Sequence, residues 1–120
     1  MGKAMKIYAA SSWWTPRHAE VVERLRREGY EVYDYREVCR AFAWCRGDDR
    51  IALADADIVV GISPFGRAAS LEIGRAAEAG KTTILYLPEI SREAELMVKI
   101  CDHICTTIEE CSAVLREVGR

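Results

Sequence analysis

The chain has 120 residues, of which 50% are hydrophobic and 30% charged, and its formal net charge at pH 7 is −2. This composition excludes a disordered or fibrous protein, and the length suffices for one hydrophobic core, so we expect a single domain over residues 1–120. Acidic and basic residues are interspersed, so bulk charge draws the chain neither to a nucleic acid polymer nor to an anionic membrane.

Targeting signals and cysteine usage indicate a compartment. No apolar run reaches the roughly 18 to 20 residues of a membrane span, and the first residues lack the apolar segment of a signal peptide. The five cysteines form no CxxC pair, which argues against a disulfide framework and favours a reducing environment. We therefore expect a cytoplasmic protein, and we expect no cofactor.

The first third of the chain predicts a strand, a helix and a second strand. MKIYAA at 5–10 is an apolar run, and PRHAEVVERLRREG at 16–29 has helical apolar spacing with Pro16 at its first position and a glycine at its end. Thr15 is the expected N-cap. YEVYDY at 30–35 alternates between apolar and polar residues like a strand.

The middle of the chain continues this alternation. One or two short helices are expected between Arg36 and Ala56, and DIVVGI at 57–62 reads as a strand buried on both faces. The loop SPFGRAA leads into the helix SLEIGRAAEAG at 70–80, with Ser70 as its N-cap and Glu72 in its first turn. The small residues Gly74 and Ala76 would let this helix pack close to the sheet.

The last third predicts two further strands, 82–87 and 102–107, and two helices, 92–100 and 108–119. Strands that alternate with helices throughout indicate an α/β fold, a flavodoxin-like or Rossmann-like three-layer sandwich with a parallel sheet of about five strands. Ligands of such sheets bind beyond the carboxyl ends of the strands. The tryptophan loop SSWWTP follows the first strand directly and so lies at that edge.

One alternative concerns metal binding. Cys101, His103 and Cys105 have the spacing that places side chains on one face of a strand, so a zinc site is conceivable. The usual zinc-ligand spacings and a fourth ligand are missing, however, so we favour buried core residues and expect no metal.

Several segments together resemble the nucleoside 2-deoxyribosyltransferases, including their branch of deoxynucleoside-monophosphate N-glycosidases. The resemblance covers nearly the whole chain: KIYAA in the first strand, RREGYEVY, the aspartate at 49, and TTIEECSAVL near the end. Its most specific part is SLEIGRAAEAGK, which is similar to the family pattern E-x-G-x-A-x-x-x-G-K and contains Glu72.

The resemblance implies an enzyme that cleaves the N-glycosidic bond of 2′-deoxynucleosides or 2′-deoxynucleotides. Glu72 matches the glutamate that attacks the anomeric carbon, Tyr8 the tyrosine that orients this glutamate, and Asp49 the aspartate that assists departure of the base. A carboxylate on one side and a proton donor on the other suit the charges that develop in this reaction. Water as acceptor would make the enzyme a hydrolase, and a second base would make it a transferase.

The substrate-binding residues expected from the resemblance lie in the loops that follow the first and third strands. Transferases of the family commonly carry an aspartate where this chain has Gly66, whereas SPFGRAAS is more similar to the serine-bearing loop of the monophosphate glycosidases. That similarity implies contacts to a 5′-phosphate, although the glycosidases usually have a glycine-rich first loop in place of SSWWTP. Trp13 is expected to stack on the nucleobase. The expected substrate contacts are Ser11, Ser12, Trp13, Ser63, Gly66, Arg67 and Ser70.

Two further expectations concern partners. Family members are dimeric or larger, so the resemblance implies a homodimer or a larger homo-oligomer that acts on a small deoxynucleoside or deoxynucleotide. The stripe of Leu96, Met97 and Ile100 is either part of such an interface or part of the core. The alternative in function is a module of the same fold that binds or senses a nucleotide without turnover.

Overall fold

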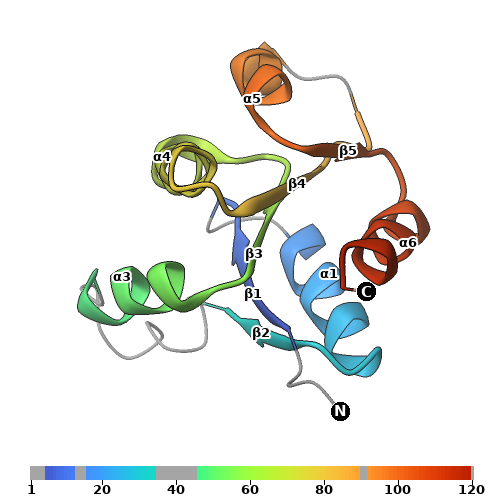
Figure 1. Cartoon of the computed structure of the whole chain (residues 1–120). Coiled ribbons are helices and arrows are strands. Elements are labelled where there is room, and N and C mark those ends of the chain that lie inside the picture. Colours follow the sequence, from blue (N-terminus) through green and yellow to red (C-terminus); the bar gives the residue numbers. More distant parts are fainter. Residues whose placement is uncertain (1–4, 13–15, 35–45, 90–91, 120) are drawn as a thin grey trace.

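The computed structural model describes residues 5–12, 16–34, 46–89 and 92–119. The described elements alternate between strands and helices, as the sequence predicts (Figure 1). They are, in chain order, β1 (Lys6–Ala10), α1 (Pro16–Arg27), β2 (Glu31–Tyr33), α3 (Arg46–Asp55), β3 (Ile58–Ile62), α4 (Gly66–Glu78), β4 (Thr82–Tyr86), the 3-10 turn η1 (Arg92–Ala94), α5 (Glu95–Ile100), β5 (His103–Cys105) and α6 (Ile108–Val118).

The five strands form one parallel sheet in the order β2-β1-β3-β4-β5. Chain order runs outward from β1 in both directions, so the crossovers on the two sides of β1 leave the sheet on opposite faces. This is the flavodoxin-like order, whose switch point lies between β1 and β3, where ligands of such folds bind. The predicted α/β sandwich is confirmed, and its switch point falls beside Tyr8.

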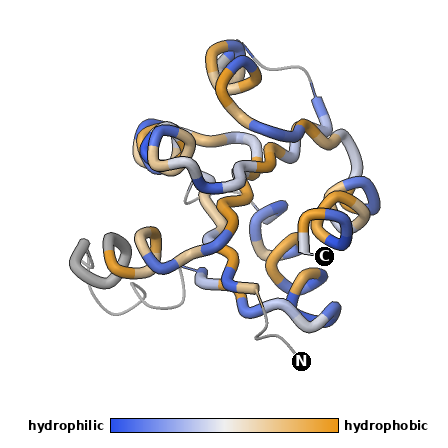
Figure 2. Tube along the Cα trace, viewed as in Figure 1, coloured by the Kyte–Doolittle hydropathy of each residue, from blue (hydrophilic) through white to orange (hydrophobic). Residues whose placement is uncertain are grey.

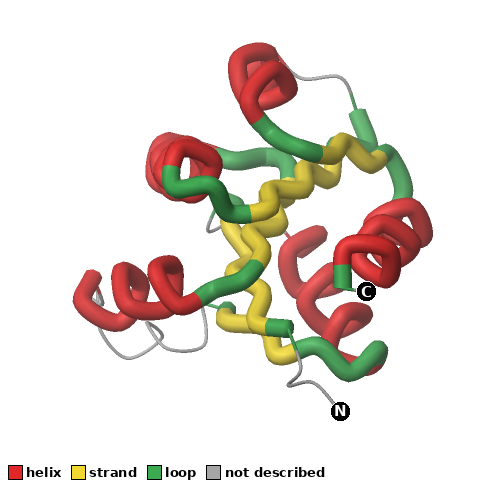
Figure 3. The backbone as a smooth tube through the Cα atoms, viewed as in Figure 1, coloured by secondary structure: helices red, strands yellow, loops and turns green. Residues whose placement is uncertain are grey.

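Helices cover both faces of the sheet, which is the central layer in Figure 3. One core lies between the sheet and α1 and α6, and it contains Ile7, Leu25 and Leu115. The second core lies on the other face, beneath α4 and α5, and it contains Tyr8 and Ile73. The strands between these cores are the most continuously apolar part of the chain (Figure 2), as expected for a parallel sheet buried on both faces.

Helix α4 begins four residues earlier than the sequence predicts. It starts at Gly66, which has a φ of +71°, a conformation that glycine adopts without steric cost. Arg67, Ala68 and Ala69 are good helix formers and extend the helix toward this glycine. The prediction that Ser70 is the N-cap was wrong. Ser70 is the fifth residue of the helix, and its hydroxyl donates to the Gly66 carbonyl at 2.7 Å.

The predicted close packing of α4 on the sheet is confirmed for Ala76, which is buried in the second core, but it is wrong for Gly74. A Cβ atom at Gly74 would meet nothing within 4 Å, so this glycine is not required for packing. A Cβ atom at Gly61 in β3 would lie 2.6 Å from Ile73 Cδ1 and 2.9 Å from Leu85 Cδ2. The strand glycine, rather than the helix glycine, therefore makes room for α4.

The three residues considered as zinc ligands, Cys101, His103 and Cys105, do not lie in a row along one strand. Cys101 precedes β5 as the C-cap of α5, so the three residues do not share one strand face. Burial raises the pKa of the Cys101 and Cys105 thiols, which disfavours the thiolate that zinc requires. Among the described residues, no three His, Cys, Asp or Glu side chains gather around one point.

The predicted stripe on α5 is divided between core and surface. Met97 is buried in the second core, whereas Leu96 and Ile100 are exposed. None of the helices in the described part of the chain has the length and apolar character needed to cross a membrane.

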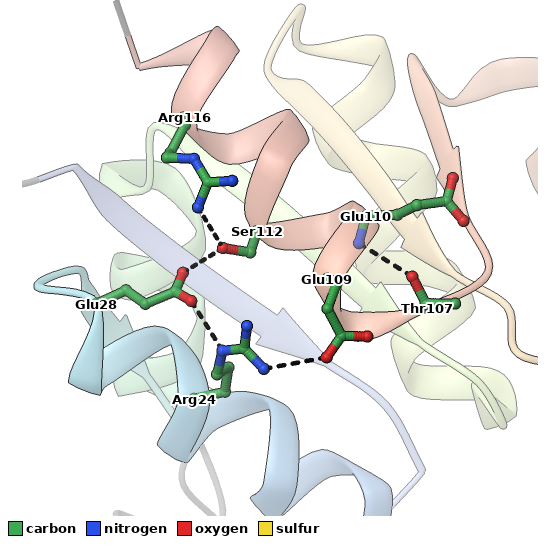
Figure 4. Close-up of polar contacts among 7 residues, drawn as sticks. All are labelled: Arg24, Glu28, Thr107, Glu109, Glu110, Ser112 and Arg116. Carbon is green, nitrogen blue, oxygen red and sulfur yellow. Dashed lines mark hydrogen bonds and ion pairs between the residues drawn. The ribbon is translucent and has the colours of Figure 1, made fainter.

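A polar network joins α1 to α6 at the surface of the first core (Figure 4). The Ser112 hydroxyl donates to Glu28 Oε1 at 2.6 Å, and Arg24 Nε donates to Glu28 Oε2 at 2.8 Å. Arg116 Nη1 donates to the Ser112 oxygen at 3.0 Å. Burial opposes ionisation of Glu28, but the bonds from Ser112 and Arg24 outweigh it and leave the pKa of Glu28 below its ordinary value.

Candidate functional site

The contact at the centre of the candidate site joins β1 to α4. The Tyr8 hydroxyl donates to Glu72 Oε2 at 2.5 Å, a short distance typical of a hydroxyl bound to a carboxylate. Tyr8 is fully buried, and Glu72 is partly buried. Two residues that lie 64 positions apart in the chain are thus held together beside the switch point of the sheet.

Tyr8 is held from its sides by neighbouring strands. It is paired with Tyr33 on β2 and with Val59 on β3. Its ring stacks on that of Tyr33 with a centroid separation of 5.4 Å and an interplanar angle of 15°. Strand alternation directs Tyr8 and Ala10 toward α4, while Ile7 and Ala9 point to the opposite core. The hydroxyl therefore has a fixed position beneath α4.

Glu72 is carried by the side of α4 that borders the sheet. The buried residues of this helix are Ala69, Ile73 and Ala76, and Glu72 adjoins them along the helix surface. Because α4 begins at Gly66, Glu72 lies in the second turn, and the predicted position among the exposed amides of the first turn was wrong. The side chain is oriented by the Tyr8 hydroxyl.

The loops that follow β1 and β3 meet at this edge. The Ser12 amide donates to the Pro64 carbonyl at 2.8 Å, and a Cβ atom at Gly66 would lie 3.8 Å from Ser12 Cβ. Ser12 is partly exposed, and Arg67 in the first turn of α4 is exposed. Three of the expected substrate contacts, Ser12, Gly66 and Arg67, thus come from adjoining segments.

Three other expected contacts are Ser63, Ser70 and Ser11, of which Ser63 and Ser11 are buried. Ser63 is buried at the end of β3, and the Ser70 hydroxyl is bonded to the Gly66 carbonyl. Ser11 is only 5% exposed, and its Oγ lies 2.5 Å from His18 Nδ1 and 3.2 Å from the Ser12 carbonyl oxygen. Ser11 thus contacts the first turn of α1 and Ser70 contacts its own helix, whereas Ser12 is partly exposed and Arg67 is exposed.

Trp13 lies outside the described residues. Asp49 lies in the first turn of α3, and its side chain is also outside the description. Helix α3 adjoins the second core through Ala52 and Leu53, and this core also lies beneath α4. The backbone therefore places Asp49 on the same side of the sheet as Glu72.

Sequence reasoning missed a group of polar residues around the first turn of α1. His18 Nε2 lies 2.9 Å from Asp34 Oδ1, and Arg17 donates to the Ser63 carbonyl at 2.8 Å and to Glu89 Oε1 at 2.5 Å. A signal for His18 was present in the sequence: it stands at positions i−3, i−4 and i−7 from the apolar residues Val21, Val22 and Leu25, on the buried face of the helix.

Arg17 also affects a neighbouring tyrosine at the end of β4. Burial raises the pKa of Tyr86, and the Arg17 guanidinium opposes this shift. A positive charge is thus present at the carboxyl ends of the strands, although a carboxylate already accompanies it.

A pocket among the described residues lies elsewhere on the molecule. It has a volume of about 570 Å³ and is lined by Ile51, Leu53, Ala54, Arg75, Ala76, Ala79 and Lys81. Lys81 precedes β4 and donates to the carbonyls of Ala54 and Ala56, which precede β3. This pocket is therefore at the amino ends of the strands, away from Tyr8 and Glu72. The candidate site is defined instead by the hydrogen bond between these two side chains.

Comparison by sequence finds no relative: no protein-family model matches the chain, and no curated protein is similar enough to be accepted. Comparison by structure finds solved proteins that have the same fold. The 2-deoxyribosyltransferase of the psychrotolerant bacterium Bacillus psychrosaccharolyticus is 22% identical, with a TM-score of 0.72 over 88% of this chain and 89% of that one.

Two further solved structures match over almost their full length. A conserved protein from Enterococcus faecalis V583 is 15% identical, with a TM-score of 0.74 over 96% of this chain and 99% of that one. The CMP N-glycosidase BcmB of Clostridium botulinum is 19% identical, with a TM-score of 0.60 over 94% of this chain and 98% of that one. At these identities the similarity establishes a shared fold. A deoxyribosyltransferase and a CMP N-glycosidase are among the proteins that have this fold.

Proposed function

We propose that this protein is an enzyme that cleaves the N-glycosidic bond of a 2′-deoxynucleoside or 2′-deoxynucleotide, with Glu72 as the nucleophile. The observation that carries the proposal is the hydrogen bond of 2.5 Å from the buried Tyr8 hydroxyl to the Glu72 carboxylate at the switch point of the sheet. A deoxyribosyltransferase and a CMP N-glycosidase among the proteins of the same fold support it.

The chemistry follows from the position of the carboxylate. A Glu72 oxygen forms a bond to the anomeric carbon as the bond to the base breaks, and the departing nitrogen takes the bonding electron pair. Asp49 would assist by supplying a proton to the base. Water or a second base then displaces Glu72 from the sugar, which restores the carboxylate and gives net retention of configuration. The Tyr8 hydroxyl fixes the orientation that the attacking oxygen needs.

Substrate contacts are proposed at the meeting of the two loops. Ser12 and Arg67 face outward there, next to Gly66, whose lack of a side chain leaves room for a ligand. A hydroxyl and a guanidinium suit a 5′-phosphate, which favours a nucleoside monophosphate as substrate. Trp13, the next residue after Ser12, is proposed to stack on the base.

A homo-oligomer is also proposed. The helices α4 and α5 pack against each other and expose Leu71 (65%), Leu96 (69%) and Ile100 (43%). Apolar side chains on neighbouring helices are typical of contact surfaces between subunits. Light scattering coupled to gel filtration tests this, and a monomer at micromolar concentration would contradict it.

The function is tested by chromatographic detection of free base after incubation with deoxynucleosides and deoxynucleoside monophosphates. Each reaction is run with and without a second base, which separates hydrolysis from transfer. We expect release with wild-type protein and with Glu78→Gln, a matched control at the exposed end of α4, and loss of release with Glu72→Gln. Folded protein that raises its melting temperature with a nucleotide but releases no base would support the binding module instead.

A further inference from the structure

A row of three buried polar side chains lies behind the loop that follows β1. Ser11 Oγ is 2.5 Å from His18 Nδ1, and His18 Nε2 is 2.9 Å from Asp34 Oδ1. The three residues are 5%, 0% and 8% exposed. With so little access to water, the proton positions in this row are determined by the partners within the protein.

The chemistry of the three groups determines which atom donates. An ionised carboxylate only accepts hydrogen bonds, so the proton on the ring nitrogen that faces Asp34 must be carried by His18 Nε2. In a neutral imidazole the other nitrogen, Nδ1, is then an acceptor, and it receives the hydroxyl proton of Ser11. The Ser11 hydroxyl also lies 3.2 Å from the Ser12 carbonyl oxygen, the longer of its two contacts.

We propose that His18 and Asp34 are positioning residues that act on the candidate site through Ser11. Asp34 selects the Nε2–H tautomer of His18, His18 fixes the Ser11 hydroxyl, and the Ser11 backbone then places Ser12. This proposal rests on the function proposed above, because Ser12 is the member of the loop that faces the substrate.

Ser12 is held from two sides as a result. Strand alternation puts the Ser11 side chain on the α1 face of the sheet, and it puts Ser12 on the opposite face, next to Gly66. The Ser12 amide is bonded to the Pro64 carbonyl at 2.8 Å, which ties the loop to the segment after β3. The buried row ties the same loop to α1 and to the end of β2.

The first turn of α1 extends this effect to two more strands. Arg17 donates to the Ser63 carbonyl after β3 and to Glu89 after β4. Adjacent residues of one helical turn, Arg17 and His18, therefore contact segments that follow β1, β2, β3 and β4. The turn sets the relative positions of the loops from which the substrate contacts come.

The test is a double-mutant cycle of Asp34→Asn and Ser11→Ala. Asparagine has the shape of aspartate but donates through its amide, so it favours the reversed His18 tautomer and removes the acceptor of the Ser11 hydroxyl. Because Ser12 contacts bound substrate, we expect each single variant to raise KM for base release about tenfold, within the range seen for residues behind a site, with little change in kcat. We expect the double variant to be no worse than either single variant.

A matched control separates positioning from stability. Glu28→Gln makes the same carboxylate-to-amide change at the far end of α1, in the network with Ser112. It should lower the free energy of unfolding and leave KM unchanged. If Asp34 had only a structural role, Asp34→Asn would likewise reduce the fraction of active protein without changing KM. Unchanged KM in Asp34→Asn, or effects of Asp34→Asn and Ser11→Ala that simply add, would overturn the proposal.

Nitrogen NMR of the imidazole gives a readout that does not depend on activity. The chain has two histidines, and a His103→Gln variant assigns the signals of His18. We expect the Nε2–H tautomer in wild-type protein, its reversal in Asp34→Asn, and a displaced Ser12 amide signal in that variant. A wild-type protein that releases no base would refute the proposed function. The NMR signals would still test the positioning role of Ser11, His18 and Asp34. An Nδ1–H tautomer in wild-type protein, or an unmoved Ser12 amide signal in Asp34→Asn, would overturn that role.

Discussion

Replacing Gly61 by alanine tests the account of how α4 is seated against the sheet. Gly61 lies in the middle strand β3, and an added methyl group would be 2.6 Å from Ile73 Cδ1 and 2.9 Å from Leu85 Cδ2. Carbon atoms normally pack at about 3.5 to 4.0 Å. Ile73 and Leu85 are both fully buried, so neither side chain moves away without disturbing its neighbours.

The expected magnitude combines two opposing effects. Overpacking a filled core costs about 1 to 3 kcal/mol. Replacing glycine in a strand recovers about 0.5 to 1 kcal/mol of backbone entropy. We therefore expect Gly61→Ala to lower the free energy of unfolding by about 1 to 2 kcal/mol. Gly74→Ala is the matched control, since its methyl group meets nothing within 4 Å, and there we expect a gain of about 0.5 to 1 kcal/mol.

The assay is urea unfolding followed by circular dichroism, with both variants and wild-type protein measured in parallel. At a slope of about 1 to 3 kcal/mol per molar urea, the two midpoints should move in opposite directions and differ by about 1 M. A Gly61→Ala protein as stable as wild type would show that the core around Ile73 is not tightly filled, and the reasoning would then fail.

Two other substitutions probe the network and the site. Ser112→Ala removes the hydroxyl bonded to Glu28 and should cost about 1 kcal/mol at neutral pH. Because the pKa of Glu28 is lowered in the folded state, this contribution is present above the unfolded pKa and is lost as the pH falls through the folded pKa. The difference from wild type in urea titrations should therefore shrink as the pH falls below the ordinary carboxyl range and through the folded pKa of Glu28, and a constant difference would contradict it. Tyr8→Phe keeps the ring stacked on Tyr33 and removes only the donor to Glu72, so base release should slow about tenfold or more, and an unchanged rate would contradict the role of the hydroxyl.

The fold was predictable because its signals are periodic and redundant. The strands β1, β3 and β4 are short and largely apolar, and the helices α1 and α6 have clear apolar stripes with a proline or a threonine at the start. Alternation of the two element types then restricts the sheet to a parallel one. The pairing of Tyr8 with Glu72 was suggested by the family resemblance, and the structure brings the two side chains into contact.

The start of α4 could not be predicted from local preferences. Ser70 has the side chain of an N-cap, but Gly66 accepts a positive φ and the three residues between them favour a helix. The preference of Ser70 for the N-cap position is weaker than the preference of the preceding residues for a helix that begins at Gly66, four residues earlier. The consequence reaches the site, because Glu72 moves from the first turn to the second.

The buried row of Ser11, His18 and Asp34 was missed for a related reason. These residues are separated by up to 23 positions, and each has an ordinary explanation by itself. Only tertiary structure shows that the ends of β1 and β2 face the same turn of α1. A histidine on the apolar stripe of an amphipathic helix is the one local sign, since a buried imidazole requires partners.

The most direct test of the central claim is mass spectrometry of protein quenched during turnover of a deoxynucleoside monophosphate. We expect a 2-deoxyribosyl ester on the α4 peptide that contains Glu72, in wild-type protein and in Glu78→Gln, and no adduct in Glu72→Gln. Base release by Glu72→Gln at the wild-type rate, with no adduct on the wild-type protein, would contradict the assignment of Glu72 as the nucleophile.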